Sequence, residues 1–451
     1  MQEDKIISQD ISTRKKILEL AWPVIIEQSL ATVTHIVDMM MVGRLGAASV
    51  TAIGLTFQPM LFAQAIGSAL SVGTTALVAR FTGASNNKDA GRVLQQSLLS
   101  AIVFSLVGGL IFLYFAENII TLMGAEKEVI EKGTSYLQLI IPGFIFMFVS
   151  FIITAALRGA GDTQTPMKVN IVINILNVIG NYILIFGSLG APALGLRGAA
   201  IATSIARLLG AIILFIIIFR EKSIITVVRK NFFLPNFKLL RRVLKIGLPT
   251  AMEQMVMRVA QIFYVRVVAG LGTVAFAAHQ ISISAESISY MPGFGIAVAA
   301  TTMVGQNLGA DQPEKAEKSS YEAWKIGSLI MGCMALVFLL IPELLIKLYT
   351  DNPEIIRLGA RNLRIIAFSQ LPMGTQFIFA GSLRGAGDTR WVFYSTAISS
   401  WIGRFSMAYI FINFFHWGLT GAWIAMVIDW VMRSSIVLYR FRQGKWKKIK
   451  V

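Results

Sequence analysis

The chain has 451 residues, of which 55% are hydrophobic and only 14% are charged, against roughly 25% charged residues in soluble domains. So few charged residues cannot cover a water-soluble body, which excludes a soluble enzyme, a disordered regulator and a secreted disulfide scaffold. The net charge of +17 comes from 41 Lys and Arg against 24 Asp and Glu, but these charges lie in clusters between apolar blocks. They do not form one basic face, so we predict an integral membrane protein that binds no nucleic acid.

Twelve apolar blocks are long enough to cross a bilayer as helices, which takes about 20 predominantly apolar residues each. They are too long and continuous for barrel strands, so an all-α fold is predicted. The blocks lie at 17–40, 50–79, 94–116, 134–157, 167–187, 198–219, 243–268, 274–304, 324–342, 358–383, 391–412 and 418–439. Lys and Arg gather on the side of the two termini, which predicts that both termini are cytoplasmic.

The two halves of the sequence are copies of each other. LRGAGDT at 157–163 recurs at 383–389, and Glu27-Gln28 recurs as Glu253-Gln254 at the same spacing. Because each copy has six spans, both have the same orientation, related by a pseudo-two-fold axis along the membrane normal. The predicted parts are a cytoplasmic segment 1–16, an N-lobe 17–219, a cytoplasmic connector 220–242, a C-lobe 243–440 and a basic cytoplasmic tail 441–451.

Several of these segments resemble the multidrug and toxic compound extrusion (MATE) family. They are WPVIIEQ at 22–28, VDMMMVGRLG at 37–46 and both LRGAGDT motifs, and residues 286–310 are similar to the DinF-like branch. The resemblance implies a secondary active exporter of organic, often cationic, compounds, driven by a proton or sodium gradient. It also implies two six-helix lobes around a central cleft, a monomer in the lipid of the bacterial inner membrane, and no cofactor or metal.

The best candidate for ion coupling is Asp38, near the outer end of the first span. A charged residue inside a span costs roughly 2.5–3.5 kcal/mol of insertion free energy, so an acid at this position is expected to have a function. In the family this acid works with polar residues of spans 5 and 6, here Asn177, Asn181 and Thr203. Some relatives have Asp where Asn181 stands, so this chain favours one proton over a more highly charged site. The alternatives are an interfacial acid and asparagines that only join helices.

Glu27 and Glu253 each follow a helix proline by four residues. Pro23 and Pro249 permit kinks and are candidate hinges. The two glutamates, with Gln28 and Gln254, are predicted to line the inner part of the cleft and attract cationic substrate. The alternative for each glutamate is a structural acid that bonds to a neighbouring helix.

Glu286, with Tyr290 one turn further along the eighth span, is a second acid that we expect to contact substrate or take part in coupling. An uncompensated acid there is costly, and Arg258 is its expected partner. Asp429 and Arg433, four residues apart, are expected to neutralise each other. Arg207 and Arg404 are expected to hold neighbouring helices or lipid headgroups.

The sequence contains no P-loop, nucleophile triad or HExxH element, which argues against transport driven by ATP on this chain. Cys333 stands alone, so no disulfide or cysteine metal site is expected. We predict a proton-coupled multidrug antiporter. The alternatives are a sodium-coupled exporter, a flippase for lipid-linked precursors and, from another class, a membrane-embedded transferase, which would turn over substrate without a gradient.

Overall fold

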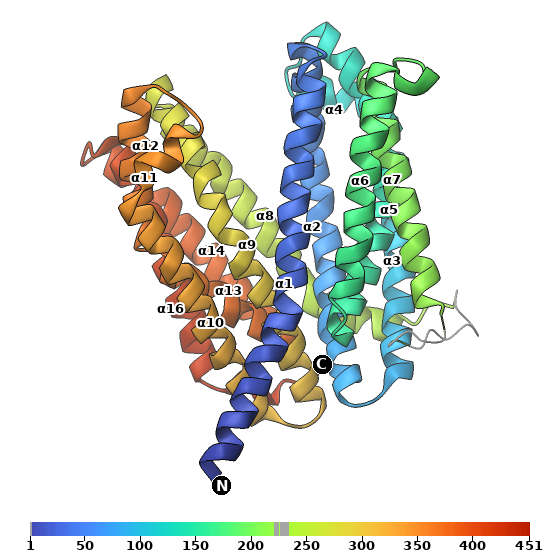
Figure 1. The fold of residues 1–451 in the computed structure, drawn as a ribbon, viewed down its shortest axis with the longest axis vertical. Coiled ribbons are helices and arrows are strands. Elements are labelled where there is room, and N and C mark those ends of the chain that lie inside the picture. The colour runs from blue at the N-terminus through green and yellow to red at the C-terminus, as the bar shows by residue number, and fades with distance from the viewer. Residues whose placement is uncertain (1, 221–224, 226–233) are drawn as a thin grey trace. The chain divides into compact units, whose positions relative to one another are not determined.

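The computed structural model describes residues 2–220, 225 and 234–451, and every regular element within these ranges is a helix (Figure 1). Most of the predicted connector 220–242 lies outside the described residues. The helices of the first repeat are α1 (Gln2–Gly43), α2 (Ala47–Gly83), α3 (Asn87–Tyr114), α4 (Ala116–Leu122), α5 (Lys127–Ala160), α6 (Gln164–Phe186), η1 (Ser188–Gly190) and α7 (Leu196–Ile218).

The second repeat has the same order of long helices, with two of them interrupted. Its elements are α8 (Phe237–Ala269), α9 (Thr273–Gly309), α10 (Pro313–Leu340), α11 (Pro342–Lys347), α12 (Pro353–Ala367), α13 (Gln370–Ala386), α14 (Thr389–Ile398), the π-helix η2 (Ser399–Ser406), α15 (Met407–Asn413), α16 (Gly418–Arg442) and η3 (Lys445–Lys448).

The prediction of an all-α membrane protein with twelve spans is confirmed. To within one residue, each predicted block coincides with one helix or with two or three consecutive helices, and nine helices in the described ranges are individually long and apolar enough to cross a membrane. The tenth predicted span is divided into α12 and α13, and the eleventh contains the π-helix. The short helices α4 and α11 were not predicted; each follows the third span of its repeat.

The chain forms two compact units. We call residues 26–248 the N-unit, and residues 1–25 together with 249–451 the C-unit. The predicted lobes begin at residues 17 and 243, whereas the boundaries between the units fall after Ile25 and before Pro249. The difference arises because the beginning of the first helix of each repeat packs in the unit that the other repeat builds.

The beginning of α1 is held in the C-unit by apolar packing and by one ion pair. Ile17, Leu20 and Ala21 are buried in a cluster with residues of α9, α10 and α13. Arg14 Nε lies 2.6 Å from the carboxylate of Glu322 on α10. This part of α1 therefore has its own core contacts upstream of Pro23.

Close backbone contacts join these helices in equivalent places of the two units. In the C-unit, a Cβ atom on Gly295 of α9 would lie 2.9 Å from the carbonyl oxygen of Ala21. In the N-unit, a Cβ atom on Gly247 of α8 would lie 1.9 Å from the carbonyl oxygen of Ala69 on α2. Ala69 and Gly247 stand at the repeat positions of Gly295 and Ala21, so the same crossing is built twice.

The N-unit is organised around α5, which packs against α2, α3 and α7, while α6 packs against α7 (Figure 1). In the C-unit, α9 and α13 take the corresponding central place, against α10, α12 and α16. These contacts place α6 and α7 side by side inside the N-unit.

Replacing Gly247 with alanine is predicted to destabilise the protein, because a methyl group cannot occupy the space next to the Ala69 carbonyl unless α8 and α2 separate. We expect a loss of about 1–3 kcal/mol in the free energy of unfolding, the usual cost of overpacking. It is measured as a lower midpoint of thermal unfolding in detergent.

Gly108→Ala is the matched control, since a Cβ at Gly108 on α3 has no atom within 4 Å. Alanine there is expected to be neutral or stabilising, because glycine weakens a helix interior. Equal unfolding midpoints for the two variants would contradict the proposed crossing of α8 and α2.

Candidate functional site

The four residues predicted to couple ions lie together within the N-unit. Asn181 Nδ2 on α6 donates to Asp38 Oδ1 on α1 at 2.7 Å. The Asn177 amide lies between Asp38 and Thr203 of α7. Asn177 and Asn181 are only 6% and 1% exposed, so this polar cluster sits in the interior of the helix bundle.

The nitrogen and oxygen of the Asn177 amide can be assigned in two ways, which give different hydrogen bonds. In one, its nitrogen donates to the Thr203 hydroxyl at 3.0 Å and its oxygen accepts from Asn181 at 3.3 Å. In the other, its nitrogen donates to the two Asp38 oxygens at 3.0 and 3.2 Å, and its oxygen accepts from the Thr203 hydroxyl at 3.0 Å. An ionised carboxylate only accepts hydrogen bonds, so it selects the second orientation.

A cavity of about 120 Å³ adjoins this cluster and is lined by residues from the N-unit. Asp38, Asn181 and Thr203 form part of its wall. Most of the remaining wall is apolar and includes Met and Phe side chains from α1, α2 and α5. Thioether side chains adapt their shape to a ligand, which suits a pocket that accepts varied compounds.

Arg207 was expected to hold neighbouring helices or lipid headgroups, and the structure places it at the Asp38 cavity inside the N-unit. Its side chain lines the cavity beside Asp38, together with His35, Gln64 and Tyr136. Its Nη1 atom is buried without a hydrogen-bond partner in the described part of the chain. The missed signal is spacing, because Arg207 lies one turn after Thr203 and so shares its helix face.

Glu27 is held by an arginine of the repeated motif. Arg158 Nη2 lies 2.6 Å from its carboxylate, and Asn170 Nδ2 donates to its other oxygen at 2.7 Å. The side chains of Glu27 and Arg158 are 12% and 17% exposed. The acid is therefore charge-balanced inside the N-unit, which favours the structural role that the sequence left open.

The C-unit repeats this arrangement at the equivalent residues. Arg384 Nη2 donates to both oxygens of Glu253, at 2.9 and 3.0 Å, and the Thr396 hydroxyl donates at 3.0 Å. We call each set a Glu–Arg brace: Glu27, Arg158 and Asn170 in the N-unit, and Glu253, Arg384 and Thr396 in the C-unit. Each brace fixes the first helix of its repeat just downstream of the proline.

The braces explain why the motif LRGAGDT recurs. Besides the arginine, its first glycine permits close packing, since a Cβ on Gly159 or Gly385 would lie 2.7 or 2.2 Å from a threonine carbonyl oxygen on the neighbouring helix. Its second glycine, Gly161 or Gly387, ends the helix in the left-handed region, with φ of 96° and 86°. Each copy of the motif therefore supplies the arginine of the brace, a close contact between two helices and the end of a helix.

Glu286 is fully buried in the C-unit, and the Tyr290 hydroxyl donates to its Oε1 at 3.1 Å. The expected partner Arg258 is instead exposed and forms no ion pair with Glu286 among the described residues. Glu286 Oε2 has no hydrogen-bond partner among the described residues. Glu286 and Tyr290 are thus brought together as predicted, without a direct ion pair.

The other buried charges of the C-unit form one cluster. Asp429 is 0% exposed and contacts Arg433 Nε at 2.6 Å, which confirms the expected neutralisation, and also Arg404 Nε at 2.8 Å. Arg404 lies in the π-helix and donates to Gln261 at 3.2 Å. As expected, Arg404 holds neighbouring helices together.

The predicted hinge prolines both lie inside helices and close to the boundaries between the units. Pro23 is two residues before the boundary after Ile25, and Pro249 is the first residue of the second part of the C-unit. Gln28 and Gln254 are half-buried. Their roles as hinges and substrate contacts stay predictions.

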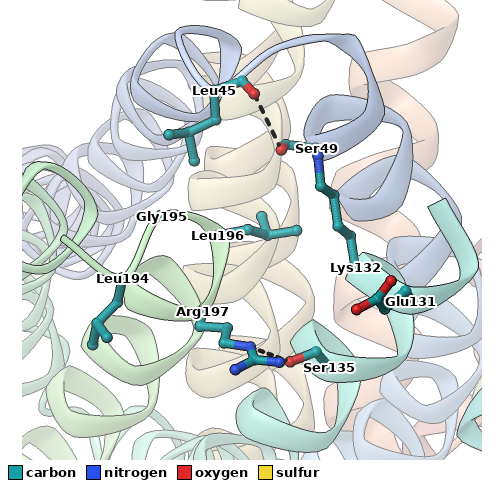
Figure 2. Close-up of a pocket in the computed structure, with 9 residues that line it drawn as sticks. All are labelled: Leu45, Ser49, Glu131, Lys132, Ser135, Leu194, Gly195, Leu196 and Arg197. Carbon is teal, nitrogen blue, oxygen red and sulfur yellow. Dashed lines mark hydrogen bonds between the residues drawn. The ribbon is translucent and has the colours of Figure 1, made fainter. Parts of the chain in front are cut away.

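A separate cavity of about 300 Å³ opens where α5 and α7 begin in the N-unit (Figure 2). Arg197 Nε donates there to the Ser135 hydroxyl at 2.8 Å, and Glu131 and Lys132 lie beside them. It shares no lining residue with the Asp38 cavity. Its mixed charge gives no reason to place ion coupling there.

Twelve membrane-spanning helices in two equivalent repeats, with a polar cluster buried inside one bundle, define a membrane transporter. The MatE family model matches residues 23–183 and 249–410, once in each repeat. The chain belongs to this family, whose members are transporters and not enzymes.

Named relatives match nearly the whole chain. A probable multidrug resistance protein NorM of Thermotoga maritima is 33% identical over 96% of this chain and 93% of its own. The multidrug resistance protein MdtK of Yersinia pseudotuberculosis is 28% identical, covering 95% of both chains. A crystal structure of MATE in the bent conformation is 25% identical, with a TM-score of 0.90, over 97% of this chain and 96% of that one.

Arg158→Ala is predicted to destabilise the N-unit, because it leaves the Glu27 carboxylate buried without its counter-charge. Breaking one partner of a buried pair costs about 3–5 kcal/mol, and the lower end applies here because both side chains keep some exposure. Thermal unfolding in detergent measures the loss.

The double variant Glu27→Gln with Arg158→Gln should lose less than Arg158→Ala, since it strands no charge. Arg92→Ala, which breaks an exposed pair with Asp89, should cost less than about 1 kcal/mol. A loss for Arg158→Ala no larger than that for Arg92→Ala would contradict the role of the brace.

Proposed function

We propose that this protein is a proton-coupled multidrug exporter, which moves organic, often cationic, compounds out of the cell by alternating access. It would act as a monomer in the bacterial inner membrane, with both termini in the cytoplasm. The names of the relatives support multidrug efflux. The observation that carries the proton coupling is the hydrogen-bonded Asp38 cluster beside a cavity in the N-unit.

Asp38 suits proton exchange because its charge is not fixed by an ion pair within the described residues. The acids Glu27, Glu253 and Asp429 each contact an arginine at 2.6–2.9 Å. Asp38 instead meets neutral amides, and the Arg207 side chain lines the same cavity without pairing with it. A proton can therefore be gained or lost at Asp38 without breaking a salt bridge.

The Asn177 amide offers a way for that proton to change the local structure. When Asp38 is ionised, Asn177 donates to it and accepts from Thr203. When Asp38 is protonated, its hydroxyl can donate to the Asn177 oxygen, and the Asn177 nitrogen then donates to Thr203. Protonation would thus reorient an amide that bridges α1, α6 and α7.

In the proposed cycle, a proton from outside neutralises Asp38 and changes which arrangement of α1 is favoured. The cationic compound loses its counter-charge and leaves outward. The proton is then released to the cytoplasm when the transporter opens inward. Coupling requires that proton and substrate bind the two states with different affinities, and Pro23 is the proposed hinge of α1.

The remaining candidate residues receive secondary roles. Glu286 with Tyr290 is proposed as a second site for proton exchange or substrate binding, because one carboxylate oxygen has no partner among the described residues. Gln28 and Gln254 are proposed substrate contacts beside the Glu–Arg braces. Pro249 is the proposed hinge of α8, and the DinF-like branch stays a prediction.

Sodium is the alternative coupling ion, and one observation favours it. Asn181 Oδ1 is buried without a hydrogen-bond donor in the part of the chain that the structure describes. Together with the oxygens of Asp38, Asn177 and Thr203 it could contribute to a cation site. A single carboxylate is a weak site for a metal cation, so we retain the proton as the first choice.

Asp38→Asn is predicted to abolish transport driven by a pH gradient, because the amide cannot take up and release a proton. The assay uses proteoliposomes and follows a fluorescent organic cation under an imposed pH gradient or an imposed sodium gradient. The wild type should respond to the pH gradient alone.

Asp311→Asn is the matched control, an identical substitution at a loop residue with a φ of 55° that asparagine tolerates. It should transport like the wild type. Transport driven by the sodium gradient alone would contradict proton coupling. It would not affect the assignment of the chain to its family. If neither gradient moves the dye, flipping of lipid-linked precursors becomes the leading function.

Asn181→Asp is predicted to add sodium dependence, because a second carboxylate would stand about 3 Å from Asp38, and two adjacent acids favour a bound cation or a shared proton. The same assay should show a larger response to the sodium gradient than in the wild type. An unchanged response to both gradients would show that residue 181 does not set the coupling ion.

A further inference from the structure

A stripe of three arginines lies on one face of α12 in the C-unit. Arg357, Arg361 and Arg364 are spaced by four and three residues, so they share a face, and all three are exposed. Arg364 contacts Glu343 of α11 at 2.6 Å. Neither Arg357 nor Arg361 forms an ion pair within the described ranges, so two positive charges of the stripe remain free to bind an anion.

With the proposed orientation, the stripe would lie at the level of the outer headgroups. Arg364 precedes Arg384 of the C-unit brace by 20 residues along the tenth span, which corresponds to about 30 Å of helix. That length matches the hydrocarbon thickness of a bilayer. With the proposed orientation, Arg384 stands at the cytoplasmic boundary, Arg364 at the outer boundary, and Arg357 and Arg361 beyond it.

An apolar groove continues from the stripe towards the membrane interior. It has a volume of about 390 Å³ and is lined by Arg361, Arg364, Ile365, Phe368, Ile424 and Val427. Phe368 is 72% exposed on its edge. A basic rim above an apolar wall formed by α12 and α16 complements a molecule with an anionic head and an acyl chain.

The fold itself does not require these charges. The equivalent positions of the first repeat hold Glu131, Ser135 and Gln138, and Figure 2 shows Glu131 and Ser135 in the mixed-charge cavity of the N-unit. Lys and Arg are also depleted on the outer side of membrane proteins. We therefore expect the three arginines to have a role other than maintaining the fold.

We propose that the groove between α12 and α16 binds an anionic phospholipid of the outer leaflet, with its phosphate against Arg357 and Arg361 and an acyl chain along Phe368. The leaflet rests on the orientation given in the proposed function, but the binding does not depend on the coupling ion. Juxtamembrane arginines attract anionic lipids with an energy that adds up per charge.

The test is native mass spectrometry of the full chain, released from nanodiscs that contain phosphatidylglycerol and phosphatidylcholine in equal amounts. The wild type should retain phosphatidylglycerol preferentially. Arg357→Gln with Arg361→Gln should lower its affinity about thirtyfold. Phe368→Ala should shorten retention of either lipid by removing part of the apolar wall.

Arg44→Gln is the matched control, an exposed arginine in the loop between α1 and α2 that is not among the residues lining the groove. It and Asp38→Asn should both retain phosphatidylglycerol like the wild type, so a failure of proton coupling would leave this result unchanged. Equal retention of the two lipids by the wild type would overturn the proposal, as would unchanged retention in the double arginine variant or an equal loss in Arg44→Gln.

Discussion

The structure depends on a buried ion pair that is made twice, between a glutamate on the first helix of each repeat and the arginine of LRGAGDT. A lone charge inside a membrane protein is costly, and a paired one is costly to break. The pairs at Glu27 and Glu253 therefore tie each first helix firmly to its own repeat. Just upstream, at Pro23 and Pro249, the same helices enter the unit that the other repeat builds. Each first helix therefore has one set of contacts before its proline and a different set after it.

The repeats share this scaffold but differ in the polar groups that it encloses. The second-repeat residues equivalent to Asp38 and Asn177 are Tyr264 and Gly403, and Met426 stands where Thr203 does. The C-unit instead encloses Asp429 with Arg404 and Arg433, whose charges are mutually compensated. The protein thus has one bundle with a titratable acid among neutral partners and another in which most buried charges are paired. This difference is the reason why we propose that coupling takes place in the N-unit.

The helices and the repeat could be predicted from the sequence because long apolar blocks and a recurring motif are local signals. The pairing of Glu27 with Arg158 could not, because it joins residues far apart in the chain, and the arginine also fitted the simpler interpretation of a topogenic charge. The place of Arg207 at the cavity could have been predicted from its spacing, because it lies one turn after Thr203, which was already a candidate residue. The boundaries between the units fall inside α1 and α8. The hydropathy of the sequence does not reveal them, because the same helix continues on both sides of each boundary. The grouping of Asp38, Asn177, Asn181 and Thr203 came from family resemblance, and the contacts explain it through one bridging amide.

We propose that Asp38 itself takes up and releases the coupling proton. Difference infrared spectroscopy tests it directly, by following the band of a protonated carboxyl group as the purified protein is acidified in lipid. We expect this band in the wild type and in Glu286→Gln, and we expect a component of it to be missing in Asp38→Asn. An identical band in Asp38→Asn would contradict the account, because the proton would then reside on another group.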